Sequence, residues 1–295
     1  MGNKLYREFD REALDAQYNA RNTVPASLFQ SIMQQYADQS RQARAVLSCT
    51  PDVAYGAHPD EVLDIFPAAA SAPTSAPVFV FIHGGYWRAL SKNESSSMAP
   101  AYTQAGAVYV ALNYSLAPAV SLDQIVQQCR RALVWVYRNI EKFGGDPSRI
   151  HIGGSSAGGH LSGMMLASGW HEDHGVPSDL VKGALLLSGL YDLAPIPHTH
   201  INAWMQLSAE DARRNSPMQY APAAGCPIVV SVGDNETEEF KRQSRDYLAD
   251  WRRRGYPGEF VHVPGSNHFD LVLECGKSDS PLARKMFDVM GLARR

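Results

Sequence analysis

Cysteine is scarce in this sequence, and the few cysteines are scattered. The chain of 295 residues has four of them, Cys49, Cys129, Cys226 and Cys275, and no two stand in a C-x-x-C pair. A disulfide framework or a structural zinc site is typically built from closely and regularly spaced cysteines. The spacing therefore favours reduced, mostly buried thiols over either of these.

The chain also lacks a long apolar run and a basic stripe. No apolar stretch approaches the ~18 residues that a membrane span requires, and the early residues are charged, unlike the apolar core of a signal peptide. We therefore expect a cytoplasmic protein with no membrane partner. The net charge of −3 at pH 7 argues against nucleic acid, because binding to phosphates requires clustered positive charge. A small-molecule substrate is the expected partner, and a homodimer is left open.

What the sequence has in quantity is an alternation of apolar strands and amphipathic helices. Strands are predicted over 53–55, 61–66, 78–83, 108–113, 150–154, 181–187, 227–232 and 259–263, and long helices over 121–143 and 236–254. The runs 78–83 and 108–113 are almost wholly apolar, which indicates parallel strands buried on both faces. The alternation predicts an α/β fold with a mostly parallel, doubly wound sheet of about eight strands.

We expect a single domain over residues 1–295, because a chain of this length can bury about 75% of the surface that its unfolded form exposes. Residues 1–50 carry apolar side chains at three- and four-residue spacing but too few of them for a domain. They are predicted to form a helical cap over the main body. Residues 191–222 are irregular and proline-bearing, and are predicted to be a cap or lid insertion.

A serine between small residues stands where a strand is predicted to run into a helix. Gly154-Ser-Ser-Ala-Gly158 fits the G-x-S-x-G pattern of a nucleophile elbow, with Ser156 at its centre. The serine of such an elbow sits on a strained turn, where strand and helix pass too close for side chains two residues to either side. Ser156 is therefore the predicted nucleophile. Ser155 is the weaker alternative, because Ala157 would then occupy one of the tight positions.

Candidate partners for this serine follow two later strands. The carboxyl ends of parallel strands meet at one edge of a sheet, where chemistry collects. Asp234 comes directly after the predicted strand 227–232, and His268 comes after the last strand. We predict His268 as the general base and Asp234 as the acid that orients it. Glu236 and Glu238 remain alternatives to Asp234.

Two histidine pairs could be considered as metal ligands, and one glycine-rich run as a dinucleotide-binding loop. His171 and His174, and likewise His198 and His200, lie in polar stretches without a third ligand at diagnostic spacing. The glycine-rich run has Ser155 at the second glycine of the dinucleotide-binding pattern G-x-G-x-x-G. Neither a metal nor a cofactor is expected.

A glycine pair after the predicted strand 78–83 supplies an oxyanion site. Gly84 and Gly85 leave room for backbone N–H groups to converge where negative charge develops. Together with the N–H of Ala157, directly after the elbow serine, they are the predicted donors.

Three motifs together resemble the α/β-hydrolases, and within them the arylformamidase (kynurenine formamidase) type. They are H-G-G-Y-W at 83–87, G-x-S-A-G-G-H at 154–160 and G-x-N-H-F at 265–269. The resemblance implies hydrolysis of N-formylkynurenine, a similar aryl amide or a short acyl ester through an acyl-enzyme. Tyr86 stands where the related hormone-sensitive-lipase pattern has a third glycine, so long-chain or bulky esters are not expected.

Two other functions are kept as alternatives. One is a general short-chain carboxylesterase, because the motifs do not fix the substrate. The other is a non-catalytic ligand-binding protein on the same fold, which the presence of all three triad residues disfavours. The predicted pocket residues, each also a credible core residue, are Tyr86, Trp87, His160, Tyr191, Trp204 and Phe269.

Overall fold

The computed structural model describes residues 4–69 and 75–292 and is built on one eight-stranded sheet. The strands are β1 (Thr50–Ala54), β2 (Val62–Phe66), β3 (Ala76–Ile82), β4 (Val108–Leu112), β5 (Gly145–Ser155), β6 (Val181–Leu187), β7 (Ile228–Ser231) and β8 (Gly258–Phe260). They lie in the order β1-β2-β4-β3-β5-β6-β7-β8. β2 is antiparallel to both neighbours, and all pairs from β4 to β8 are parallel. The predicted fold class is confirmed.

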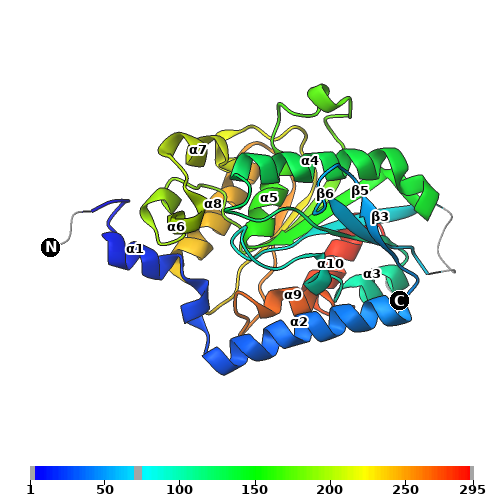
Figure 1. Cartoon of the computed structure of the whole chain (residues 1–295), viewed down its shortest axis with the longest axis horizontal. Helices are drawn as coiled ribbons and strands as arrows, with labels where there is room; N and C mark the ends of the chain where they lie inside the picture. Colours follow the sequence, from blue (N-terminus) through cyan, green and yellow to red (C-terminus); the bar gives the residue numbers. More distant parts are fainter. Residues whose placement is uncertain (1–3, 70–74, 293–295) are drawn as a thin grey trace.

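Helices cover both faces of the sheet, as the apolar central strands require. The helices are α1 (Arg11–Gln17), α2 (Ala26–Val46), α3 (Ala99–Ala105), α4 (Leu122–Asn139), α5 (Ala157–Leu166), α6 (Asn202–Met205), α7 (Ala209–Arg214), α8 (Glu238–Arg253), α9 (Asp270–Cys275) and α10 (Pro281–Met290). In β3, Val78 and Val80 share a core with α4, α5 and α8. Phe79 and Phe81 alternate with them and share the other core with α2, α3, α9 and α10 (Figure 1).

The helix predicted over 121–143 forms with strong end signals. Ser121 caps α4 in a capping box with Gln124, in which each side chain accepts from the other's backbone N–H. The helix passes into a 3-10 turn, η3 (Ile140–Phe143), and ends at Gly144, whose φ of +80° places it in the left-handed region. Glycine adopts that conformation without a steric penalty.

The N-terminal segment is helical and is fastened to the start of α8. After α1 it continues through the 3-10 turn η1 (Ala20–Thr23) into α2. Gln17 accepts from the Thr237 hydroxyl at 2.6 Å through its carbonyl and from the Glu239 N–H at 3.1 Å through its side chain. The buried Tyr18 hydroxyl donates to Glu239 at 2.8 Å. These bonds join residues more than two hundred positions apart.

The segment 191–222 carries α6 and α7, and it lies at the same end of the molecule as α1 (Figure 1). The two are in contact, because the His200 ring nitrogen Nδ1 lies 3.1 Å from the Asp15 carboxylate. The N-terminal segment and this insertion thus meet beyond the sheet.

Within residues 4–69 and 75–292, none of the helices combines the length and the apolar composition of a membrane span. The four cysteines are unpaired, with Cys129, Cys226 and Cys275 buried and Cys49 half-buried.

Candidate active site

Ser156 occupies a sharp turn between β5 and α5. The strand ends at Ser155, the helix begins at Ala157, and Ser156 between them has φ 58° and ψ −118°. This is a conformation that residues with a side chain rarely adopt, and such strain is concentrated at functional sites. The geometry favours Ser156 over Ser155, which continues the extended strand.

The glycines of the elbow are required by close packing. A Cβ on Gly154 would collide with the carbonyl of Gly158, and a Cβ on Gly158 would collide with the carbonyl of Ile82. The start of α5 therefore packs at backbone contact against the end of β5 and against the end of the neighbouring strand β3. This is the steric reason that the G-x-S-x-G pattern implied.

His268 is held by Glu236, not by Asp234. The Nδ1 atom of His268 lies 2.6 Å from Glu236 Oε2, and both residues are buried. The other oxygen, Oε1, accepts from the Gly233 N–H at 2.6 Å and from the Ser188 hydroxyl at 2.5 Å. With both oxygens bonded, the carboxylate and the ring have one defined orientation.

The prediction that Asp234 orients His268 is wrong, and the turn after β7 explains why. The Glu236 N–H donates to the Gly233 carbonyl at 3.1 Å, which reverses the chain and carries Glu236 back over the end of the strand. Asp234, at the tip of this turn, faces outward and binds His262 Nε2 at 2.6 Å and the Gly265 N–H at 2.8 Å. Those two bonds lower the pKa of the Asp234 carboxyl.

The predicted oxyanion loop lies against the elbow. A Cβ on Gly84 would stand 2.7 Å from the Ser155 carbonyl oxygen and 3.3 Å from the Ser156 Cβ, so only glycine allows this approach. Gly85 has φ +98° and would also clash there with a side chain, against Ala89. Ala157 is the first residue of α5, where backbone N–H groups have no partner within the helix. Gly84 thus packs against Ser156, Gly85 lines the same pocket, and Ala157 follows Ser156 in the chain. That their N–H groups bind the oxyanion stays a prediction.

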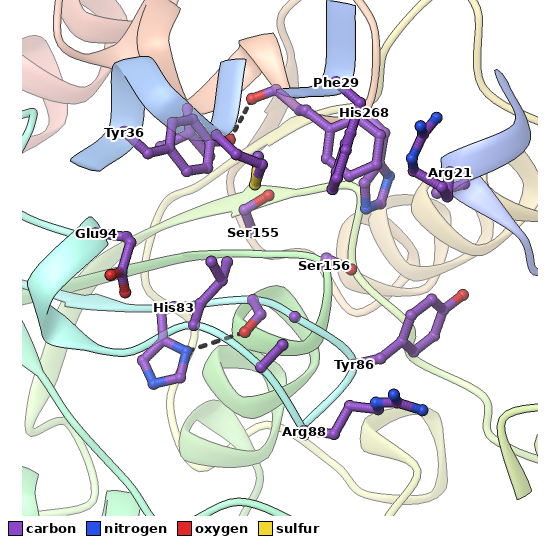
Figure 2. Close-up of a pocket in the computed structure, with 18 of the residues that line it drawn as sticks. Arg21, Phe29, Tyr36, His83, Tyr86, Arg88, Glu94, Ser155, Ser156 and His268 are labelled. Carbon is purple, nitrogen blue, oxygen red and sulfur yellow. Dashed lines mark hydrogen bonds between the residues drawn. The ribbon is translucent and has the colours of Figure 1, made fainter. Parts of the chain in front are cut away.

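Ser156, His268 and the glycines of the oxyanion loop line a pocket of about 470 Å³. Its lining comes from five parts of the chain, of which His200 and Trp204 belong to the insertion and the last three residues to the region of His268. The residues are Asn19, Ala20, Arg21, Phe29, Met33 and Tyr36; Phe81, His83, Gly84, Gly85, Tyr86, Arg88, Ala89, Leu90, Glu94 and Ser95; Ser155 and Ser156; and His200, Trp204, His268, Phe269 and Val272. In Figure 2, Ser156 lies between Glu94 on one side and Arg21 and Arg88 on the other.

Three predicted pocket residues are instead part of the core. Tyr86, Phe269 and Trp204 line the pocket as expected. Trp87, His160 and Tyr191 have no exposed surface and do not line it. The motifs placed these rings near the pocket, but their side chains pack in the core behind the residues that line it.

Trp87 and His160 support the oxyanion loop from behind. The Trp87 indole N–H donates to His160 Nδ1 at 3.2 Å, and His160 Nε2–H donates to the Asn215 carbonyl at 2.6 Å. Burial lowers the pKa of His160 to about 4, so the ring is neutral at pH 7. This bridge joins the loop to α5 and to the insertion.

His83 anchors the other end of the loop. Its ring stacks on Tyr114 at 4.0 Å, and the Tyr114 hydroxyl donates to the His83 carbonyl at 2.9 Å. The ring's Nδ1–H donates to the Gly84 carbonyl at 2.9 Å. Burial lowers the pKa of His83 to about 4. A neutral, fixed His83 therefore sets the direction of the Gly84 peptide.

The N-terminal contribution to the pocket was not predicted residue by residue. Phe29, Met33 and Tyr36 recur at four- and three-residue spacing, which marks one face of α2. That signal shows a shared face, but it does not show what the face covers. Arg21, in η1, carries no sequence signal of its own.

The paired histidines do not form a metal site. Within residues 4–69 and 75–292, no three potential metal-ligating side chains come together. His171 stacks on Trp170 at 4.0 Å, and His200 is bound to Asp15.

The arrangement is suited to acyl transfer. A serine becomes nucleophilic when a neutral imidazole accepts its proton, and a buried carboxylate fixes the imidazole's tautomer. Here the Glu236 carboxylate accepts from His268 Nδ1, which leaves Nε2 as the proton acceptor. Figure 2 shows the His268 ring and Ser156 on the same side of the pocket.

Comparison with known proteins gives matches over most of the chain. Residues 63–249 match the BD-FAE family model. Kynurenine formamidase of Danio rerio is 32% identical, covering 97% of this chain and 98% of its own length. Kynurenine formamidase of Salmo salar is also 32% identical, covering 96% of each chain. Among solved structures, esterase B of Lactobacillus rhamnosis superposes with a TM-score of 0.69 at 17% identity, covering 92% of this chain and 95% of that one.

Proposed function

Because the chain belongs to the α/β-hydrolase family of the kynurenine formamidases and matches the BD-FAE family, we propose that it hydrolyses an aryl N-formyl amide of the N-formylkynurenine type or a short-chain acyl ester. The reaction proceeds through an acyl-enzyme on Ser156. The observation that carries the proposal is the buried Glu236–His268 pair, whose histidine lines the same pocket as Ser156 in its strained elbow.

In the first step, His268 Nε2 takes the proton of Ser156 while the serine oxygen attacks the formyl carbon. Negative charge on the carbonyl oxygen is stabilised by the backbone N–H groups of Gly84, Gly85 and Ala157. Glu236 stays ionised and stabilises the imidazolium. The carbon–nitrogen bond then breaks, and His268 returns its proton to the leaving aryl amine.

In the second step, His268 takes a proton from water, and the resulting hydroxide attacks the formyl ester on Ser156. The same three N–H groups stabilise the second tetrahedral intermediate. Its collapse releases formic acid, which ionises to formate in water, and His268 returns its proton to the Ser156 oxygen. All transferred protons pass through His268 Nε2, so the cycle uses only groups of this chain and water.

Aromatic side chains around the elbow suit an aryl substrate. Phe29 and Phe269 meet edge to face with ring centroids 4.9 Å apart, and Trp204 and Tyr86 do so at 6.4 Å. All four line the pocket. A planar ring can pack against such surfaces at little entropic cost.

A general short-chain carboxylesterase is the second candidate, since an ester passes through the same tetrahedral intermediate. The two are separated by a competition assay in which N-formylkynurenine and phenyl acetate are offered together. A series of aryl esters from formate to octanoate, corrected for intrinsic reactivity, then measures acyl size. We expect formyl and acetyl to exceed butyryl by about ten- to a hundredfold in kcat/KM, because each surplus methylene must displace packed atoms. A maximum at butyryl or longer chains makes the esterase the better assignment.

A cytoplasmic location and a homodimer also remain proposals. Sedimentation velocity tests the second. Absence of hydrolysis of every amide and ester tested, with a folded protein, points to the non-catalytic ligand-binding alternative.

A further inference from the structure

Ser188 lies directly after β6, and its hydroxyl donates to the acid that orients the general base. The bond joins Ser188 Oγ to Glu236 Oε1 at 2.5 Å, and both residues are buried. The other donor to this oxygen, the Gly233 N–H at 2.6 Å, belongs to the same turn as Glu236. The Gly233 N–H therefore moves with the carboxylate, whereas the Ser188 hydroxyl holds the carboxylate from the end of the neighbouring strand.

The backbone of Ser188 is in an unusual conformation for a serine. Its φ is 47°, in the left-handed region that residues with a Cβ adopt only at a cost. Glycine adopts this conformation freely, but it has no hydroxyl. Serine is thus the less favourable residue for this backbone, and such outliers are concentrated where a side chain has a function.

The same turn also holds the nucleophile. The Ser156 N–H donates to the Leu187 carbonyl at 2.8 Å, and the Ser188 N–H donates to the Ser231 carbonyl at 2.8 Å, at the end of β7. Two consecutive residues, Leu187 and Ser188, thus bond the backbone of the nucleophile and the carboxylate of Glu236.

Ser188 affects the reaction from outside the pocket. It has no exposed surface and does not belong to the lining that contains Ser156. Its route to the chemistry is Glu236, whose Oε2 atom lies 2.6 Å from His268 Nδ1. The two oxygens of a carboxylate belong to one planar group, so a bond that fixes Oε1 also fixes the direction of Oε2.

We infer that Ser188 is a positioning residue for the reaction: its hydroxyl orients the Glu236 carboxylate towards His268, and its turn keeps that acid in place relative to Ser156. The inference rests on the proposed reaction and adds a residue to its machinery. A hydrogen bond to a charged group is about twice as strong as one between neutral groups, so its loss should be visible in the rate. Because the hydroxyl does not contact the substrate, the loss should fall on kcat and not on KM.

Two substitutions separate the hydroxyl from the strained backbone. Ser188→Ala removes only the hydroxyl, and Ser188→Gly removes the hydroxyl and also the Cβ that strains the turn. We expect each to lower kcat on phenyl acetate by about tenfold or more, with KM changed by less than about twofold. A loss of kcat in the alanine variant that the glycine variant restores would assign the effect to backbone strain and overturn the inference.

A double-mutant cycle tests whether Ser188 acts through Glu236. In the Glu236→Gln enzyme the orienting acid is already lost, so adding Ser188→Ala should lower kcat by less than about a further twofold. If the two substitutions multiply each other's effects, Ser188 acts independently of Glu236 and the inference is wrong.

Ser280→Ala is the matched control. Ser280 is also buried, and its hydroxyl accepts from the Ala283 N–H at 3.1 Å to cap α10, away from the pocket. Its substitution should lower the denaturation midpoint and leave kcat within about twofold. An equal loss of kcat in Ser280→Ala and Ser188→Ala would show that lower stability explains both, which also overturns the inference.

The rate at which a phosphonate inhibitor labels Ser156 is a readout that needs no substrate. It depends on the activation of the serine by His268, so Ser188→Ala should lower it by about tenfold or more. If no amide or ester is hydrolysed but this rate falls in the Ser188 variants, the inference stands and the proposed function fails. If the wild-type enzyme hydrolyses these substrates and the Ser188 variants equal it in kcat and in labelling rate, the inference fails and the proposed function stands.

Discussion

At the scale of single residues, Glu236 and Asp234 show how two carboxylates on one turn acquire different roles. Glu236 is buried with both oxygens bonded, one of them to His268. Asp234 is two residues away, and its carboxylate forms a hydrogen bond with the exposed ring of His262. The carboxyl chemistry is identical, so the direction of the turn makes the difference. This gives a matched pair of isosteric substitutions.

Glu236→Gln should reduce kcat by about three orders of magnitude or more with little change in KM, because an amide facing His268 no longer favours the tautomer that leaves Nε2 free. Asp234→Asn should change kcat by less than about threefold, since exposed charge pairs contribute little. Steady-state kinetics on both variants, with circular dichroism to check folding, makes the comparison. The reverse order of effects would restore Asp234 as the orienting acid.

The two neighbouring serines offer a second matched pair. Ser156→Ala should lower turnover by about three orders of magnitude or more, as expected for loss of a nucleophile. Ser155→Ala removes the same oxygen one residue earlier, within β5, and should retain activity to within about tenfold. Mass spectrometry after treatment with a phosphonate inhibitor should find the adduct on Ser156. An adduct on Ser155, or an active Ser156→Ala enzyme, would assign the nucleophile elsewhere.

At the scale of elements, the differences between prediction and structure fall where the site is built. The helix predicted from residue 236 begins at Glu238, so Glu236 lies outside it, at the end of the turn that starts at Gly233. The strand predicted over 259–263 ends at Phe260, which frees His262 to bind Asp234. Apolar periodicity located these elements correctly, because it reports burial. It could not show which acid of a polar turn points inward.

The same limit applies to the oxyanion loop. The glycine pair predicted the backbone donors, since a close approach needs residues without a Cβ. Tyr86 and Trp87 both have positive φ, which sequence does not predict for aromatic residues. That conformation turns Trp87 into the core to meet His160 and leaves Tyr86 on the pocket wall.

The attachment of the N-terminal segment can be tested at Tyr18. Its buried hydroxyl donates to Glu239 and accepts from Gln243 at 3.1 Å. Tyr18→Phe should lower the free energy of unfolding by about 1–2 kcal/mol, because it removes a hydrogen bond to a charged group and leaves buried partners short of one. KM should rise more than kcat falls, since Ala20 and Arg21 just beyond it line the pocket.

Tyr220→Phe is the control for this prediction. The Tyr220 hydroxyl donates to the Arg214 carbonyl at 2.7 Å in an exposed position away from the pocket. Its loss should cost less than about 1 kcal/mol and leave KM unchanged. Denaturant titration and steady-state kinetics measure both quantities. Equal effects of the two variants would show that Tyr18 has no special part in holding the segment.

At the scale of the whole molecule, the sheet was predictable and the closure of the pocket was not. The alternation of apolar strands and helices predicted a mostly parallel sheet of about eight strands, which the structure has. The pocket wall, by contrast, brings Arg21 and Phe29 from one end of the chain to His268 near the other. Such contacts depend on side-chain bonds between distant residues, as between Tyr18 and Glu239. No local pattern encodes them.

Buried neutral histidines make the stability of the whole molecule depend on pH. Burial lowers the pKa of His83, His151 and His160 to about 4 in each case. In the unfolded chain a histidine has a pKa of about 6.5. Between these values the unfolded state binds protons that the folded state does not, so acidification favours unfolding. The contribution is complete above pH ~6.5 and is lost as the pH falls towards ~4.

We therefore expect the free energy of unfolding to fall steadily between about pH 6.5 and pH 4, by up to about 3 kcal/mol per buried histidine. Denaturant titrations at intervals of pH measure the slope of the free energy of unfolding against pH, which gives the number of protons taken up on unfolding.

His151→Gln should reduce that number by up to one, because His151 is buried in β5 and its Nδ1–H donates to the Arg149 carbonyl at 2.9 Å. Ile152→Val, at the next position of the same strand, should lower stability by about 1 kcal/mol at every pH without changing the slope. A stability that stays constant from pH 6.5 to 4.5 would mean that these histidines take up protons in the folded state and that their burial does not keep them neutral.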